Sequence, residues 1–95
     1  MRNYELSVIV SPEVEQEALD STVDRIKQFV ATGGGLVTKV DIWGRRRLAY
    51  PIHKHLEGYY AVLQAQIPQE ALPELERNLK LSEDVIRYLV VRLDA

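Results

Sequence analysis

Residues 60–67 read Tyr-Ala-Val-Leu-Gln-Ala-Gln-Ile. Small and aliphatic side chains alternate here with a second set that includes both glutamines, and a period of two predicts a half-buried β-strand. The expected apolar face of this strand holds Ala61, Leu63, Ala65 and Ile67. The middle of the chain therefore provides a strand around which the neighbouring segments can be placed.

Another extended segment precedes this strand. It runs from Leu36 to Ile52, and a loop is expected at residues 56–58 between the two. Gly44 interrupts the alternation of the earlier segment, which predicts a β-bulge. Pro51 has no N–H to donate to a neighbouring strand. The segment is therefore expected at an edge of the sheet.

Two further segments have the spacing of an amphipathic helix. The first is expected to begin at residues 11–13, where Ser11 can cap it and Glu13 lies near its positive end, and to end at the glycines 33–35. The second is expected to begin at residues 68–70, with Pro73 tolerated only within the first turn. The apolar stripes are Leu19, Val23, Ile26 and Val30 in the first helix and Leu72, Leu75 and Leu79 in the second.

Alternating segments near the two ends, Arg2–Ser11 and Val85–Leu93, complete the order βαββαβ. This order predicts an α+β fold, the ferredoxin-like sandwich, in which two helices cover one face of a four-stranded antiparallel sheet. The second and fourth strands are then the edges, in agreement with Pro51. A chain of 95 residues is expected to form a single domain over residues 1–95.

The composition excludes several classes of protein. There is no cysteine, so the chain has no disulfide, thiol nucleophile or Cys-ligated zinc. The first residues lack the apolar run of a signal peptide, and no stretch approaches the ~20 apolar residues of a membrane span. These features predict a protein of a reducing compartment.

Charge is unevenly distributed along the chain, although its formal sum is only −2. Residues 13–32 and residues 70–84 each hold five acids and two bases, while residues 39–55 hold five bases and one acid. The expected helical layer is therefore acidic and the expected edge segment is basic. An acidic protein can still present a basic face to a nucleic acid.

The basic segment has two interpretations. It contains or adjoins Trp43, Tyr50, Tyr59 and Tyr60, and guanidinium groups beside flat side chains are typical of RNA contact. Charge on an edge strand also prevents aggregation. The run Arg45-Arg46-Arg47 beside a bulge favours RNA contact, whereas the strand positions of Tyr4 and Tyr50 predict that they belong to the core.

Catalysis has little support in this sequence. His53, His55 and Glu57 occupy alternate positions and could hold a divalent ion together with water, but polar residues at a strand end are more often simply solvated. No serine lies in a nucleophile motif, and the glycines 33–35 lack the Gly-Lys-Ser/Thr ending of a phosphate loop. We expect no enzyme, no metal site and no cofactor.

Four stretches resemble the bacterial small-subunit ribosomal protein S-six family, and the resemblance covers the whole chain in order and spacing. They are Met1–Glu5, Trp43–Ile52, Gly58–Tyr60 and Ile86–Val91. The resemblance implies a ferredoxin-like fold, a structural role in the 30S subunit of the cytoplasmic ribosome, and no catalysis. It also implies binding to the central domain of small-subunit ribosomal RNA, cooperatively with ribosomal protein S-eighteen, in subunit assembly and translation.

By the family pattern, Arg2 and residues 45–54 are the parts nearest to RNA or partner. Charge and strand placement add two arginines of the last strand. The candidate RNA- or partner-binding residues are thus Arg2, Arg45, Arg46, Arg47, His53, Lys54, Arg87 and Arg92.

Two alternatives remain open beside the metal-dependent enzyme. One is a free-standing RNA-recognition module of the same topology, although residues 57–64 share only a glycine and some aromatic character with its third-strand motif. The other is an oligomerising interaction domain whose exposed edge strand pairs with a second copy.

Overall fold

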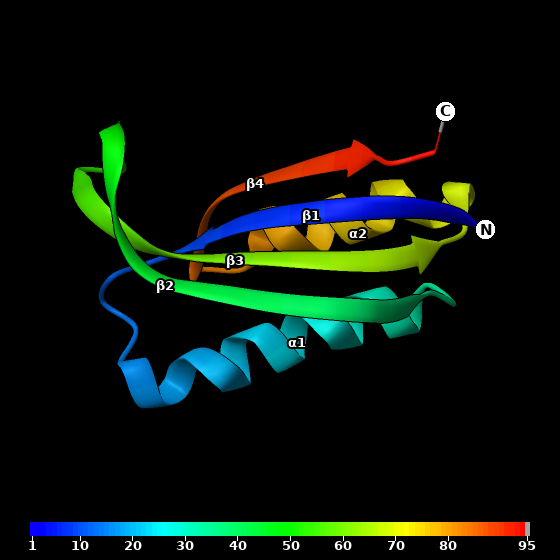
Figure 1. Cartoon of the computed structure of the whole chain (residues 1–95), viewed down its shortest axis with the longest axis horizontal. Helices are drawn as coiled ribbons and strands as arrows, with labels where there is room; N and C mark the ends of the chain where they lie inside the picture. Colours follow the sequence, from blue (N-terminus) through cyan, green and yellow to red (C-terminus); the bar gives the residue numbers. More distant parts are fainter. Residues whose placement is uncertain (95) are drawn as a thin grey trace.

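The computed structural model describes residues 1–94, which form one four-stranded antiparallel sheet and two α-helices (Figure 1). The strand order is β2-β3-β1-β4, so β2 and β4 are the edges, as predicted. In chain order the elements are β1 (Arg2–Val10), the 3-10 turn η1 (Gln16–Ala18), α1 (Leu19–Thr32), β2 (Leu36–Ile52), β3 (His55–Ile67), the 3-10 turn η2 (Gln69–Ala71), α2 (Leu72–Leu81) and β4 (Val85–Arg92). The ferredoxin-like sandwich is confirmed.

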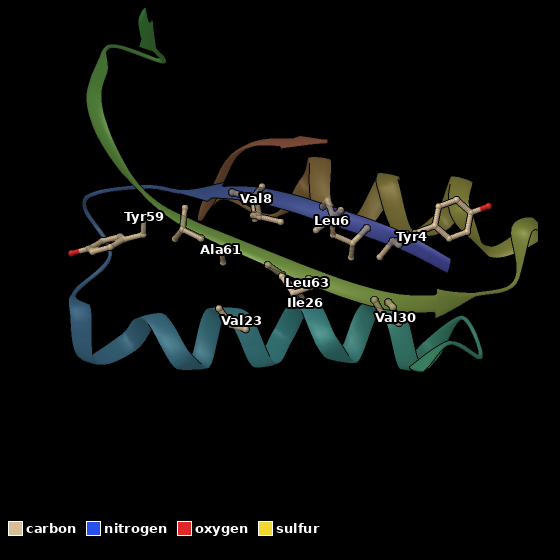
Figure 2. Packing of buried hydrophobic residues seen from close by; sticks show 14 of the residues in the cluster. Tyr4, Leu6, Val8, Val23, Ile26, Val30, Tyr59, Ala61 and Leu63 are labelled. Carbon is tan, nitrogen blue, oxygen red and sulfur yellow. The ribbon is translucent and has the colours of Figure 1, made fainter. Parts of the chain in front are cut away.

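A single apolar core lies between the sheet and the helices. Leu6 of β1 stands directly opposite Leu63 of β3, and both are fully buried. Val23, Ile26 and Val30 of α1 project towards these strands (Figure 2). Side chains from α2 join the same cluster, so both helices cover one face and the other face is open. The predicted apolar stripes are confirmed.

Both helices begin later than the sequence predicts. Ser11 Oγ accepts a hydrogen bond from the backbone N–H of Glu13 at 3.2 Å, and the backbone N–H of Ser11 donates to Asp84 O at 2.7 Å. The hydroxyl therefore closes a local turn at the end of β1, and α1 begins only at Leu19. In the same way η2 precedes α2, which begins at Leu72 with Pro73 in its first turn.

The expected loop at residues 56–58 is wrong. The chain reverses at His53 and Lys54, whose φ angles of 50° and 69° are both positive, as a two-residue hairpin turn requires. β3 consequently starts at His55. Gly58 marks a close approach within the sheet, because a Cβ placed there would lie 2.5 Å from Ile9 Cγ2.

The long edge strand β2 is irregular at the predicted position. Its register against β3 shifts between Ile42 and Gly44, and Gly44 has a φ of 84°. This is the expected bulge. It leads into the hairpin that carries most of the candidate residues.

Candidate nucleic-acid and partner interface

Residues 45–58 form a projecting arm made of the end of β2, the turn and the start of β3. The pairing of β3 with β1 ends at Tyr59, which lies opposite Val10, so the arm extends beyond the central strand. Figure 1 shows it curling away from one end of the sheet. We call the side that continues the helix-covered face the helix side of the arm, and the other its open side.

Arg45 lies on the helix side and is held there by its neighbours. Its Nε donates to Glu57 Oε2 at 3.1 Å, and its guanidinium carbon lies 5.7 Å from the centre of the Tyr59 ring. The hydrogen bond and charge of Glu57 raise the pKa of the Arg45 guanidinium above its ordinary value. The guanidinium of Arg45 is therefore already paired with a carboxylate of the same chain.

The next two arginines point to opposite sides of the arm. Arg46 stands opposite Gly58, on the open side, and Arg47 stands opposite Glu57, on the helix side. Arg47 also lines a hollow of about 440 Å³ with Pro12, Lys54, His55, Leu56 and Glu57. Among the described residues, no ion pair involves Arg46, Arg47 or Lys54.

Tyr50 connects the arm to the far edge strand. Arg87 of β4 donates a hydrogen bond from Nη1 to the Tyr50 hydroxyl, and its guanidinium carbon lies 5.6 Å from the ring centre. Tyr50 is 54% exposed, so its expected place in the core is wrong, whereas Tyr4 is only 4% exposed and belongs to the core as expected. The bond brings Arg87 into the same region as the arm.

The open face of the sheet carries an aromatic pair beside aliphatic side chains. Trp43 stacks on Tyr60 with ring centres 6.2 Å apart and planes inclined by 8°. The Trp43 Nε1 donates to Asp41 Oδ2 at 3.1 Å. A hollow of about 290 Å³ beside the pair is lined mainly by apolar atoms, and Leu89 at its margin is exposed. Within residues 1–94 no helix packs on this face.

Arg2 and Arg92 lie at the other end of the sheet. Arg2 pairs with Ile67 and Arg92 with Tyr4, whereas Arg87 pairs with Ile9 near the arm. The seven residue-to-residue steps from Arg2 to Ile9 correspond to roughly 23 Å of strand. The candidate residues thus form two groups: Arg45, Arg46, Arg47, His53, Lys54 and Arg87 at the arm, and Arg2 and Arg92 at the opposite end.

The alternative metal site finds no support. Within residues 1–94 no three His, Cys, Asp or Glu side chains come together in a way that could hold an ion. His53 lies in the turn and His55 in the strand that follows it, so the two no longer share one extended segment. In the same described part of the chain, no helix is long and apolar enough to span a membrane.

The sequence did not predict three features of this region. They are the pairing of Arg45 with Glu57, the hydrogen bond from Arg87 to Tyr50, and the stacking of Trp43 on Tyr60. The hairpin turn at residues 53–54 pairs Ile52 with His55, and a register shift between Arg47 and Ile52 then places Glu57 opposite Arg47 and Tyr59 opposite Arg45. The turn alone would therefore not have predicted the first of these features.

Comparison with known proteins agrees with this architecture. A family model described as ribosomal protein S6 matches residues 3–92. The chain belongs to the ribosomal protein S6 family. It is 45% identical to the small ribosomal subunit protein bS6 of Moorella thermoacetica over 94 residues, which is 99% of this chain and 96% of that protein. It is 46% identical to the bS6 of Beutenbergia cavernae over 95 residues, 100% of this chain and 99% of that protein.

The fold agrees as well. The crystal structure of 30S ribosomal protein S6 from Thermotoga maritima matches with a TM-score of 0.90 and 33% identity, covering 96% of this chain and 86% of that one. As an S6-family protein, the chain has a structural role in the small subunit of the cytoplasmic ribosome and is not an enzyme.

Proposed function

We propose that this S6-family protein binds the central domain of small-subunit ribosomal RNA cooperatively with ribosomal protein S-eighteen, and acts in this way in subunit assembly and translation. The observation that carries the proposal is the separation of charge in space. The arm holds Arg46, Arg47 and Lys54 without a carboxylate partner among the described residues. Residues 13–32 and 70–84, which include the two helices and the segments beside them, each hold five acids and two bases.

Phosphate binding by the arm follows from this separation. Each Lys or Arg that neutralises a phosphate releases condensed counterions, which gives affinity without requiring a particular base sequence. The excess acids of residues 13–32 and 70–84 disfavour RNA binding at those segments. The overall charge of −2 predicts weak binding by the protein alone, so a partner is needed for tight binding.

The open face supplies a surface for that partner. Leu89 of β4 lines the same mainly apolar hollow as the Trp43–Tyr60 pair. Leu89 and Val91, further along β4, are both exposed. Burial of such a patch favours association with another protein. RNA on the arm and protein on the open face would then each complete the site of the other, a coupling of typically ~1–3 kcal/mol.

Filter binding tests this proposal with a central-domain RNA fragment, with and without S-eighteen. We expect S-eighteen to tighten RNA binding by about 5- to 150-fold, the range that corresponds to this coupling. The affinity of S-eighteen for the protein should rise by the same factor when RNA is present, because coupling is reciprocal. Equal RNA affinity with and without S-eighteen would contradict the cooperative function.

The stacked pair on the open face gives a specific reason to consider a second function, that of a free-standing RNA-recognition module. In such a module, unpaired bases of the bound RNA would stack on Trp43, the only tryptophan of the chain. Tryptophan fluorescence separates the two functions. Quenching by single-stranded RNA alone would favour the module, whereas a shift in emission on adding S-eighteen alone supports docking of that protein on the open face.

A further inference from the structure

The arm exposes positive charge on two opposite sides. Successive side chains of a strand alternate between faces, and the pairing of Arg46 with Gly58 and of Arg47 with Glu57 assigns the two arginines to different sides. A run of three arginines in the sequence is therefore not one continuous patch in space.

The cations of the helix side converge on one hollow. Arg45 is held by Glu57 at 3.1 Å, which leaves Arg47 and Lys54 at the margin of the hollow beside Pro12. Both side chains are exposed, and neither forms an ion pair within the described residues. This side has room and charge for a phosphate group.

The open side carries a separate pair of cations. Arg46 faces a glycine, which has no side chain to pair with it, so its guanidinium is exposed to solvent. Arg87 lies on the same side, where its bond to Tyr50 joins the arm to β4. The arm is thus held to β4 on the side that carries Arg46.

From this arrangement we infer that the arm inserts between two stretches of RNA backbone, with Arg46 neutralising phosphates of one stretch and Arg47 and Lys54 those of the other. The inference rests on the proposed function and specifies the kind of RNA involved. A regular A-form helix has a major groove too deep and narrow for side chains to read. The occupant is therefore a junction or a widened groove, where two backbones lie on either side of a two-stranded ribbon.

Salt titrations of single variants test whether RNA contacts one side of the arm or both sides. We expect Arg46→Ala and Arg47→Ala each to reduce the salt slope of RNA binding by about 0.7–0.9, the value for one phosphate contact, and the double variant to reduce it by about twice as much. Lys80→Ala removes an exposed cation from α2 and should leave the slope unchanged. All measurements use the full chain with S-eighteen present.

Cleavage of the RNA by a probe attached at position 46 or at position 47 shows directly which stretch of RNA lies near each position. The chain has no cysteine, so an iron chelate can be attached at Arg46→Cys or at Arg47→Cys alone. We expect the two probes to cut separate stretches of the RNA, and a junction fragment to bind more tightly than a continuous duplex of equal length.

The outcomes separate this inference from the function on which it rests. If only one of the two arginines changes the slope, or if both probes cut the same stretch, the two-sided arm is refuted while RNA binding stands. If neither arginine changes the slope, the arm is not the RNA-binding element and the inference fails, whereas the proposed function fails only if S-eighteen leaves the RNA affinity unchanged.

Discussion

Gly58 allows a close approach between β3 and β1, and replacing it with alanine should destabilise the protein. The added Cβ would lie 2.5 Å from Ile9 Cγ2 and 3.2 Å from Val10 O. Carbon atoms in contact are normally about 3.5–4.0 Å apart, so one of the two strands or the Ile9 side chain must move by about 1 Å. Ile9 is β-branched and has little rotamer freedom to retreat.

The expected cost follows from this overlap. Overpacking of this kind typically costs about 1–3 kcal/mol, and each kcal/mol lowers the Tm of a domain of this size by roughly 4–8 °C. Urea unfolding of Gly58→Ala should therefore give a lower free energy of unfolding with an unchanged m-value. The change lies at the base of the arm, so native-state hydrogen exchange of residues 45–58 should also accelerate.

A double-mutant cycle isolates the cause. Ile9→Ala removes the clashing methyl group, so Gly58→Ala should cost at least about 1 kcal/mol less in that background. Gly44→Ala serves as the control. It is strained by a φ of 84° but has no neighbouring atom within 4 Å of the new Cβ, and its cost should be the same in both backgrounds. An equal cost of Gly58→Ala with Ile9 and with Ala at position 9 would refute the steric explanation.

Three further predictions concern the core, the end of β4 and the arm. Leu63→Ala should cost about 2–5 kcal/mol in urea unfolding because the side chain is fully buried; a loss under 1 kcal/mol would contradict its central place. The Asp94 carboxylate accepts the backbone N–H of Asn3 at 2.8 Å, and this bond lowers the Asp94 pKa, so an NMR titration should give a value below the usual ~3.9. The stability that ionised Asp94 contributes is present above its unfolded pKa and is lost as the pH falls through the lowered folded pKa. The difference in free energy of unfolding between the wild type and Asp94→Ala should therefore become smaller on acidification. A difference that becomes larger would refute the assignment. Tyr50→Phe removes the hydroxyl that accepts from Arg87 and should increase the exchange of arm amides with little change in global stability, and unchanged exchange would show that the bond does not hold the arm.

Periodicity in the sequence identifies which residues of each element face the core, and here it did so correctly for the helices and the central strands but not for Tyr50 on the arm. The alternation of Ala61 and Leu63 and the stripe of Val23 and Ile26 all lie where expected. Pro51 gives the edge position of β2 because the missing N–H is a property of the residue itself. Such signals are local and need no knowledge of the rest of the chain.

Other features depend on choices that the residue types leave open. Ser11 has a hydroxyl that can cap a helix or close a turn, and the bond of its N–H to Asp84 O favours the turn. His53 and Lys54 adopt positive φ without being Gly or Asn, while Gly58, which suggests a turn, serves a close contact instead. The turn, together with the register shift between Arg47 and Ile52, sets the partner of Arg45 and the side on which Arg46 lies.

The order of strands in the sheet also has a consequence for synthesis on the ribosome. β1 is made first, but its neighbours are β3 and β4, and the pairing of Tyr4 with Arg92 joins residues near the two ends of the chain. A nascent chain can therefore complete only one side of β1 until β4 has left the exit tunnel. Contacts of such long sequence separation slow folding and leave strand edges exposed in the meantime. During translation the edge of β1 that β4 later covers is thus open to incorrect pairing.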